Sequence, residues 1–292
     1  MSRLPPLLRL LRPQQWTKNL ACMAGVVFGG RLGQPHAVLL DVAVTLTFVL
    51  AASAVYVVND LLDLAHDRQH AAKRTRPLAA GEVSTTAAGV LAAGLAIAAA
   101  MLAVALGPAT ATCVAAYGAL NLFYSLGLKH VVVLDVCCIA MGYVLRVLAG
   151  VVVLGDVPTG WILLCTFFLA LFLAFTKRRA ELVDPERSGH DQRPVLKAYD
   201  RHALDSLVDS SATMAVMTYA LFTATSGKNP SLIVTVPIVY YAVMHYRQLM
   251  RQTDFGQEPD RLLLTDRTLQ ACIVLWLIAF VAIFYGHWTF VR

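Results

Sequence analysis

The sequence has few charged residues for its length. Only 14% of its 292 residues are Asp, Glu, Lys or Arg, whereas 58% are hydrophobic. An ordinary soluble domain carries about 25% charged residues. This composition excludes a typical soluble globular protein and indicates a polytopic membrane protein.

Cysteines and the common catalytic motifs are also scarce. The six cysteines lie in apolar stretches and no two form a CxxC pair, so they are expected to act as small buried hydrophobes. The eight histidines have no spacing typical of metal ligands, and no P-loop, Gly-x-Ser-x-Gly or dinucleotide fingerprint is present. The net charge of +6 requires no nucleic-acid partner.

Long apolar stretches fill most of the chain, and a bilayer-spanning helix needs about 20 such residues. The first stretch is the weakest because it contains Lys18. We therefore expect an all-α integral membrane protein with nine transmembrane helices in a single polytopic domain, residues 1–292. The nine stretches are residues 14–30, 38–60, 85–106, 109–127, 131–154, 158–176, 204–226, 231–247 and 268–290.

The basic residues indicate how these spans are oriented. All but four of the 24 lysines and arginines lie in the N-terminal segment or in the loops after the second, fourth, sixth and eighth spans. Loops rich in Lys and Arg stay on the cytoplasmic side of a membrane. The N-terminus and the even-numbered loops are therefore predicted to be cytoplasmic, and nine spans place the C-terminus on the extracytoplasmic side.

An acidic motif ends the second apolar stretch, in the segment NDLLDLAHDRQHAAKRTRPLAAG, residues 59–81. In a continuous helix, Asn59, Asp63 and Asp67 recur every four residues, and Asp60 shares their face at spacings of three and seven. Like charges stacked in this way repel and need compensation. Mg²⁺ supplies it, typically through one or two carboxylates together with water and substrate phosphate oxygens.

A basic run follows the acidic motif directly and ends at Pro77. Lys73, Arg74 and Arg76 are suited to bind oxyanions. Carboxylates for a metal beside cations for oxyanions are what a diphosphate leaving group requires. The alternative, a helix end that is simply solvated by charge, would explain one aspartate more readily than this spaced series.

The motif NDLLDLAHD, residues 59–67, resembles the N-D-x-x-D-x-x-x-D motif of the UbiA superfamily of intramembrane prenyltransferases. This resemblance implies a nine-helix, all-α bundle in which aspartate motifs hold Mg²⁺ and a diphosphate over a cavity open to the membrane. The catalytic loops are then expected at residues 61–84, 177–203 and 248–267, on the cytoplasmic side.

Further blocks resemble one branch of that superfamily, the decaprenyl-phosphate phosphoribosyltransferases. The resemblance implies transfer of 5-phosphoribose from phosphoribosyl pyrophosphate (PRPP) to a polyprenyl phosphate. It also implies a role in cell-envelope polysaccharide precursor synthesis at a bacterial inner membrane. The blocks are RPQQWTKN (12–19), YSLGLKH (124–130), YVLRVLAG (143–150), FTKRRAEL (175–182) and GQEPDRLLLTDRTLQ (256–270).

One departure from the superfamily supports this branch. Aromatic prenyltransferases carry a second motif, D-x-x-x-D, after the sixth helix. Residues 177–205 contain no such motif, but they hold seven basic residues between Lys177 and Arg201. A substrate with both a 5-phosphate and a pyrophosphate, meeting an acceptor that is itself a phosphate, suits these extra cations.

Arg146 lies inside the predicted fifth span, where an arginine costs at least ~2.5 kcal/mol against lipid and is normally paired or lines a cavity. A structural ion pair and phosphate binding are both open, and the match of YVLR to the branch favours phosphate. Lys18 and Lys129, at span ends, are either snorkelling anchors or PRPP ligands. Tyr56 is suited either to bind substrate or to pack in the core.

The expected site therefore combines metal, catalytic and substrate-binding groups. Asn59 and Asp63, together with Asp60 or Asp67, are expected to hold Mg²⁺, and Asp60, Asp63 and Asp67 are the expected catalytic residues. The expected substrate ligands are Lys18, Tyr56, Lys73, Arg76, Lys129, Arg146 and Lys177.

Two other functions stay open on the sequence. One is a UbiA-type prenyltransferase that joins a prenyl diphosphate to an aromatic acceptor, which the lack of a second motif disfavours. The other is a secondary transporter, which would be expected to show inverted repeats or paired broken helices, and neither is visible.

Overall fold

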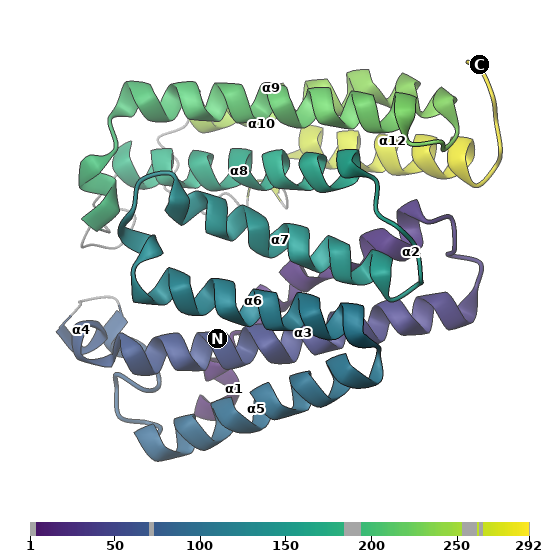
Figure 1. Cartoon of the computed structure of the whole chain (residues 1–292). Helices are drawn as coiled ribbons and strands as arrows, with labels where there is room; N and C mark the ends of the chain where they lie inside the picture. Colours follow the sequence, from purple (N-terminus) through teal and green to yellow (C-terminus); the bar gives the residue numbers. More distant parts are fainter. Residues whose placement is uncertain (1–3, 70–72, 184–193, 253–261, 263–264, 292) are drawn as a thin grey trace. The chain divides into compact units, whose positions relative to one another are not determined.

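The computed structural model describes residues 4–69, 73–183, 194–252, 262 and 265–291 (Figure 1). Every regular element in this part of the chain is helical, which confirms the predicted all-α class. The elements are α1 (Pro6–Leu10), η1 (Pro13–Met23), α2 (Ala24–Phe28), α3 (Pro35–Leu62), α4 (Leu64–Gln69), η2 (Lys73–Thr75), α5 (Thr85–Ala105), α6 (Pro108–Leu126), η3 (Leu128–His130), α7 (Leu134–Val152), α8 (Gly160–Val183), η4 (Pro194–Ala198), α9 (Arg201–Thr225), η5 (Pro230–Thr235), α10 (Val236–Gln252) and α12 (Arg267–Phe284).

Five of these helices are long and apolar enough to cross a membrane: α3, α5, α7, α8 and α12. The nine predicted stretches all contain helix, but the count of nine spans stays a prediction. The first stretch, residues 14–30, forms the eleven-residue 3₁₀ segment η1 followed by the short α2, not one α-helix. A 3₁₀ run of that length is uncommon and marks a segment shaped by its packing rather than by helix propensity.

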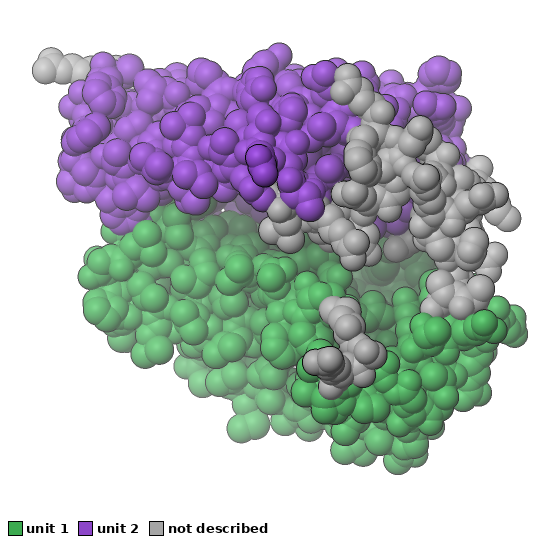
Figure 2. All heavy atoms as spheres, turned by 180° about the vertical axis from the view of Figure 1, so that it is seen from behind, with its two compact units in different colours: residues 1–131, 142–157, 189–191 green, residues 132–141, 158–188, 192–292 purple. Residues whose placement is uncertain are grey.

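The chain forms two compact units, which Figure 2 colours separately. The first consists of residues 1–131, 142–157 and 189–191. The second consists of residues 132–141, 158–188 and 192–292. Helix α7 contributes its first turns to the second unit and its later turns to the first.

Local signals in the sequence fix several helix ends. The side chains of Ser84, Asp200 and Asp266 accept hydrogen bonds from backbone N–H groups in the first turns of α5, α9 and α12. Such N-caps satisfy donors that have no partner within the helix. Pro108 opens α6 after Gly107, whose φ of 117° makes the tight α5–α6 turn.

Two glycines bring η1 and α2 against α7 in the first unit. A Cβ at Gly150 would lie 1.8 Å from the carbonyl oxygen of Cys22, and one at Gly25 would lie 2.2 Å from the carbonyl oxygen of Gly150. Only glycine permits this backbone approach. The contact fixes the N-terminal segment beside the part of α7 that carries Arg146.

The core of the first unit is built on α3. Val44 and Phe48 are fully buried there and pack with Ala99 of α5 and Tyr117 of α6. Phe48 and Tyr117 meet edge to face, with ring centroids 5.4 Å apart. The second unit pairs α8 with α9 and α10 with α12 (Figure 1).

Candidate active site

The acidic motif lies where α3 gives way to α4. Helix α3 ends at Leu62, and Asp63 is its C-cap residue. The helical hydrogen-bond pattern nevertheless continues, with Asp63 N bonded to Asn59 O at 2.9 Å and Asp67 N to Asp63 O at 2.8 Å. The motif side chains therefore keep roughly helical spacing across the junction.

Asp60 and Asp67 form a buried pair held by two arginines. Arg12 donates to Asp60 Oδ1 at 2.5 Å, and Arg76 Nη1 contacts both Asp60 Oδ1 at 3.2 Å and Asp67 Oδ2 at 2.6 Å. The two aspartate side chains are only 4% and 3% exposed. Their charges are thus compensated within the protein, so their first role is to hold α3, α4 and the Arg76 loop together.

Asn59 and Asp63 face different partners. Ser125 at the end of α6 donates to Asn59 Oδ1 at 2.6 Å, and Lys129 Nζ contacts Asp63 Oδ1 at 3.1 Å. The Asp63 side chain is 42% exposed, which makes it the most accessible aspartate of the motif. Asn59 and Asp63 therefore present their oxygens beside a cation and near the surface.

The four motif side chains have different partners. Successive helical residues are rotated by about 100°, so the four positions span about 100° of the helix circumference. Asn59 and Asp63 contact Ser125 and Lys129, whereas Asp60 and Asp67 share Arg76.

Arg76→Ala is expected to lower thermal stability, because it leaves Asp67 buried without a cation and Asp60 with Arg12 alone. Breaking a buried pair by removing one partner typically costs about 3–5 kcal/mol. The double variant Arg76→Ala with Asp67→Asn is expected to recover part of that loss, since the uncompensated charge goes with it. Thermal unfolding of the purified variants in detergent measures both; equal stability of Arg76→Ala and wild type would contradict this role.

The oxygen donors of Asn59 and Asp63 fit Mg²⁺ chemically. Among the described residues, no group of three or more His, Cys, Asp or Glu side chains is placed to hold a metal by itself. Mg²⁺ does not require such a cage, because it is commonly bound by one or two carboxylates with waters and substrate phosphates. An accessible carboxylate one turn from an amide oxygen is consistent with that mode of binding.

Arg146 is a buried cation surrounded by neutral groups. Its side chain donates from Nε to Asn19 Oδ1 at 2.8 Å, from Nη1 to Gly142 O at 2.8 Å and from Nη2 to Tyr117 Oη at 3.0 Å. The guanidinium also lies over the Tyr117 ring, 4.6 Å from its centroid. Arg146 is 6% exposed, and in the described part of the chain no carboxylate lies within ion-pair distance of it.

The remaining expected substrate ligands are more scattered. Lys18 lies in η1 with a half-buried side chain, and Lys73 lies in η2. Tyr56 on α3 is covered by the Arg12 guanidinium, 5.1 Å from its ring centroid, so it packs beside the Asp60 pair. Lys177 lies on α8, in the second unit.

Several residues at the site were not predicted individually. Arg12 and Asn19 belong to the quoted sequence blocks, but nothing in the local sequence indicates that Arg12 meets Asp60, 48 residues away, or that Ser125 meets Asn59, 66 residues away. Tyr117 gave no signal at all. These contacts depend on how distant helices pack.

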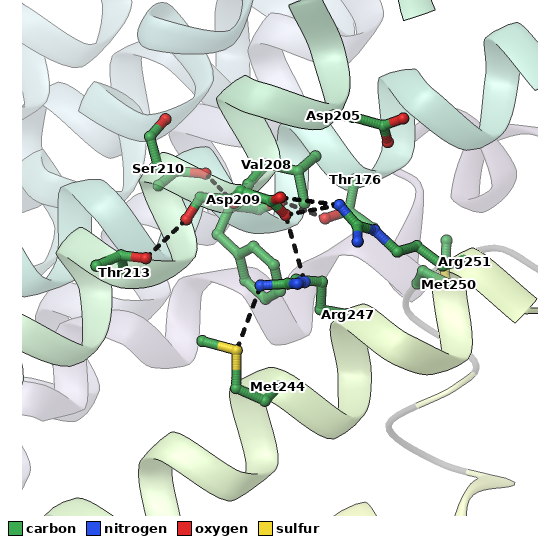
Figure 3. Close-up of polar contacts among 12 residues, drawn as sticks. Thr176, Asp205, Val208, Asp209, Ser210, Thr213, Met244, Arg247, Met250 and Arg251 are labelled. Atoms are coloured by element: carbon green, nitrogen blue, oxygen red, sulfur yellow. Dashed lines mark hydrogen bonds and ion pairs between the residues drawn. The ribbon is translucent and has the colours of Figure 1, made fainter. Parts of the chain in front are cut away.

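The D-x-x-x-D spacing does occur at the end of the 177–205 segment, and it was not predicted from the sequence. Asp205 and Asp209 on α9 are four residues apart, giving D-x-x-x-D. Asp209 is bound by Arg251 at 2.9 Å and by Arg247 at 3.3 Å, as Figure 3 shows, and Asp205 pairs with Arg179. Since each carboxylate already has an arginine partner, the pair acts first as a link between helices of the second unit.

A second polar cluster in that unit lies at the start of α7. Asp135 is fully buried and receives Arg178 Nε at 2.9 Å and the Tyr199 hydroxyl at 2.9 Å. Burial raises the pKa of Tyr199, so its phenol stays protonated and donates. Tyr199 Oη in turn accepts the N–H of Val133, whose φ of 69° is strained for a β-branched residue. Arg178 also binds Glu181 at 3.0 Å.

The helices and the polar groups define a class of protein: a multi-pass, all-α membrane protein with a carboxylate and cation site at a helix end. The chain belongs to the UbiA prenyltransferase family, which it matches over residues 19–265. It is 33% identical to the decaprenyl-phosphate phosphoribosyltransferase of Corynebacterium glutamicum, over 96% of this chain and 86% of that protein. It is 35% identical to the protein of the same name from Mycolicibacterium smegmatis, over 93% of this chain and 90% of that protein.

A solved structure shares the fold. The UbiA homologue of Archaeoglobus fulgidus, bound to GPP and Mg²⁺, superposes with a TM-score of 0.73 over 96% of this chain and 99% of that one. The two sequences are 21% identical, so this likeness concerns the fold alone. It confirms the UbiA-type architecture that the motif in residues 59–67 implied.

Proposed function

We propose that this protein transfers 5-phosphoribose from PRPP to a polyprenyl phosphate and releases pyrophosphate. The observation that carries the proposal is that relatives bearing the name decaprenyl-phosphate phosphoribosyltransferase are 33–35% identical to the chain over nearly its whole length. The accessible Asn59–Asp63 pair beside Lys129 supplies a chemically suitable place for the pyrophosphate.

Different residues are proposed to hold the metal, to bind phosphate oxygens and to support the acidic motif. Asp63 and Asn59 would hold Mg²⁺, which when bound neutralises the charge of the pyrophosphate as it leaves. Lys129, Lys18 and Lys73 are proposed to bind phosphate oxygens around them. Arg12 and Arg76 keep Asp60 and Asp67 in place, so the acidic motif is a rigid support for Asp63.

The proposed reaction is one substitution at the anomeric carbon of the ribose. An oxygen of the acceptor phosphate forms the new bond to C1, and the bond from C1 to the pyrophosphate oxygen breaks with its electron pair leaving on pyrophosphate. The acceptor phosphate is already anionic near neutral pH, so no strong general base is required. Positioning and charge stabilisation then supply most of the rate.

We further propose nine spans with a cytoplasmic N-terminus in a bacterial inner membrane. In a cysteine-free background, Lys73→Cys is expected to react with an impermeant maleimide only from the cytoplasmic side, and Asn229→Cys only from the outside. Labelling is compared in intact cells and in inverted vesicles. Reaction of Lys73→Cys in intact cells would overturn this orientation. Gly189, in the predicted loop after α8, lies outside the described residues.

One assay tests the activity itself. Purified protein is incubated with PRPP, Mg²⁺ and a polyprenyl phosphate, and the lipid product is followed by mass spectrometry. A mass increase equal to one phosphoribosyl group is expected. Turnover of geranyl diphosphate with an aromatic acceptor, and none with PRPP, would replace this function by the prenyltransferase alternative.

A further inference from the structure

An elongated apolar groove lies in the first unit between α3, α5 and α6. Its volume is about 530 Å³, within the range of sites for small organic molecules. Helices α5 and α6 meet at the Gly107 turn and separate toward their other ends, and α3 runs between them in the view of Figure 1. The α6 lining runs from Ala111 to Ser125, about 21 Å along a helix axis, or two-thirds of a bilayer's roughly 30 Å hydrocarbon core.

Small side chains form the walls of this groove, yet the helices do not close over it. The lining on α5 is almost entirely alanine, including Ala92, Ala96 and Ala100, and α6 adds Ala115 and Gly118. In membranes, small residues at such spacings normally let two helices pack backbone to backbone. Here these small residues leave the groove open instead, and Ala96, Ala100 and Gly118 lie at its exposed rims. The shape is that of a binding site for a chain rather than of a helix contact.

Polar groups are concentrated at one end of the groove, and that end belongs to the candidate active site. Asn59 and Ser125 line it and are hydrogen bonded to each other at 2.6 Å, and Asn121 lies one turn deeper on α6. Asp63, one turn beyond Asn59, contacts Lys129. An apolar chain lying in the groove would therefore carry its head group to the Asn59–Asp63–Lys129 corner.

We propose that this groove holds the first isoprene units of the polyprenyl phosphate acceptor, with the acceptor phosphate at the Asn59–Ser125 end, next to the pyrophosphate proposed at Asp63 and Lys129; the assignment rests on the proposed function. The site has the volume for a segment of one chain, whereas a membrane phospholipid brings two. No Lys or Arg is among the described residues that line the groove, and Asn59, Asn121 and Ser125 lie toward one end of it, which suits a lipid with a single polar head group. The apolar walls supply affinity, and the polar Asn59–Ser125 end sets the direction in which the chain lies.

The test fills the groove without disturbing the helices. A Cβ added at Gly118 meets no atom within 4 Å, so the leucine side chain of Gly118→Leu has room to occupy the groove. Gly94→Leu on α5 is the matched control, because a Cβ there is equally unobstructed and Gly94 does not line the groove. Both substitutions replace a helical glycine by a better helix former, so both proteins are expected to fold at least as stably as wild type.

Binding of polyprenyl phosphate is measured without PRPP, by native mass spectrometry from detergent, with phosphatidylglycerol as competitor. Gly118→Leu is expected to weaken binding at least about tenfold, because displacing two buried methylenes is enough for that. Gly94→Leu is expected to bind like wild type. Unchanged polyprenyl phosphate binding by Gly118→Leu overturns the proposal, as does a variant that loses only phosphatidylglycerol.

Turnover with PRPP is then measured on the same samples, which separates the two proposals. If wild type binds polyprenyl phosphate in the groove but transfers nothing from PRPP, the proposed function falls and the lipid site stands. If transfer occurs and Gly118→Leu has the wild-type KM for polyprenyl phosphate, the lipid site falls and the function stands.

Discussion

Asp63→Ala is expected to lose at least about a hundredfold in turnover, the size of effect seen when one charge-stabilising group is removed from an active site. Asp63 is the accessible carboxylate of the motif, 42% exposed, and its partner Lys129 contacts it at 3.1 Å. Its removal leaves no buried charge uncompensated, so insertion and folding are expected to be unchanged. The initial rate with PRPP, polyprenyl phosphate and Mg²⁺ measures the effect, together with loss of wild-type activity in EDTA and its return with Mg²⁺.

Asp156→Ala is the matched control. Asp156 is 32% exposed and pairs with Arg31 at 2.5 Å, so it is an aspartate in a comparable ion pair of the same unit. The predicted topology places it on the extracytoplasmic side, and its variant is expected to retain wild-type turnover. Full activity of Asp63→Ala in metal-free buffer would remove the basis for a metal site at this residue.

The helical class of the fold could be read from the sequence because long apolar runs leave the chain few alternatives in a membrane. Helices α3 and α5 follow their predicted stretches within a few residues. The N-terminal stretch, residues 14–30, does not form the single helix that was predicted, since apolar content alone does not distinguish an α-helix from η1 and α2. There the close approach of Gly25 and Gly150 determines the backbone, and that approach is a property of the folded unit.

The acidic motif was predicted as a group, but its internal division was not. Local spacing indicates which side chains lie near one another, whereas the partner of each is set by segments far away in the chain. Asp60 is paired by Arg12 and Asn59 by Ser125, and no local pattern links these residues. The role of Asp63 as the accessible member emerges only when the other two aspartates are seen to be buried.

Arg146 is the second residue whose substitution is expected to have a large effect. Three of the five N–H groups of its guanidinium are used by Asn19, Gly142 and Tyr117, and all three acceptors are neutral. Among the described residues its positive charge therefore has no anionic partner within ion-pair distance. A buried cation of this kind is costly in a membrane unless an anion compensates it. A phosphate of the substrate would do so through the two remaining N–H groups.

Both PRPP and a prenyl diphosphate carry a pyrophosphate, so the Asp63 corner by itself does not distinguish them. PRPP adds a 5-phosphate on the far side of the ribose, and we propose Arg146 as the cation that meets it. Arg146→Ala is expected to weaken PRPP binding about ten- to a hundredfold, as loss of a charge-assisted contact worth roughly 1.5–3 kcal/mol implies. Binding of free pyrophosphate with Mg²⁺ is expected to change much less. Isothermal titration calorimetry with each ligand measures the difference.

Arg146→Lys separates phosphate binding from a structural role. A lysine keeps the positive charge but not the planar set of donors that ties Asn19, Gly142 and Tyr117 together. If Arg146 binds phosphate, Arg146→Lys recovers part of the PRPP affinity. If Arg146 only stabilises the packing of the helices, Arg146→Ala and Arg146→Lys lose stability to the same extent, and the affinities for PRPP and for pyrophosphate fall equally. Arg31→Ala, at the Asp156 pair, controls for loss of an arginine elsewhere in the same unit. Equal losses of affinity for PRPP and for pyrophosphate in Arg146→Ala would show that Arg146 does not recognise the 5-phosphate. If the wild-type protein binds geranyl diphosphate tightly and does not bind PRPP, the phosphoribosyl assignment itself is wrong.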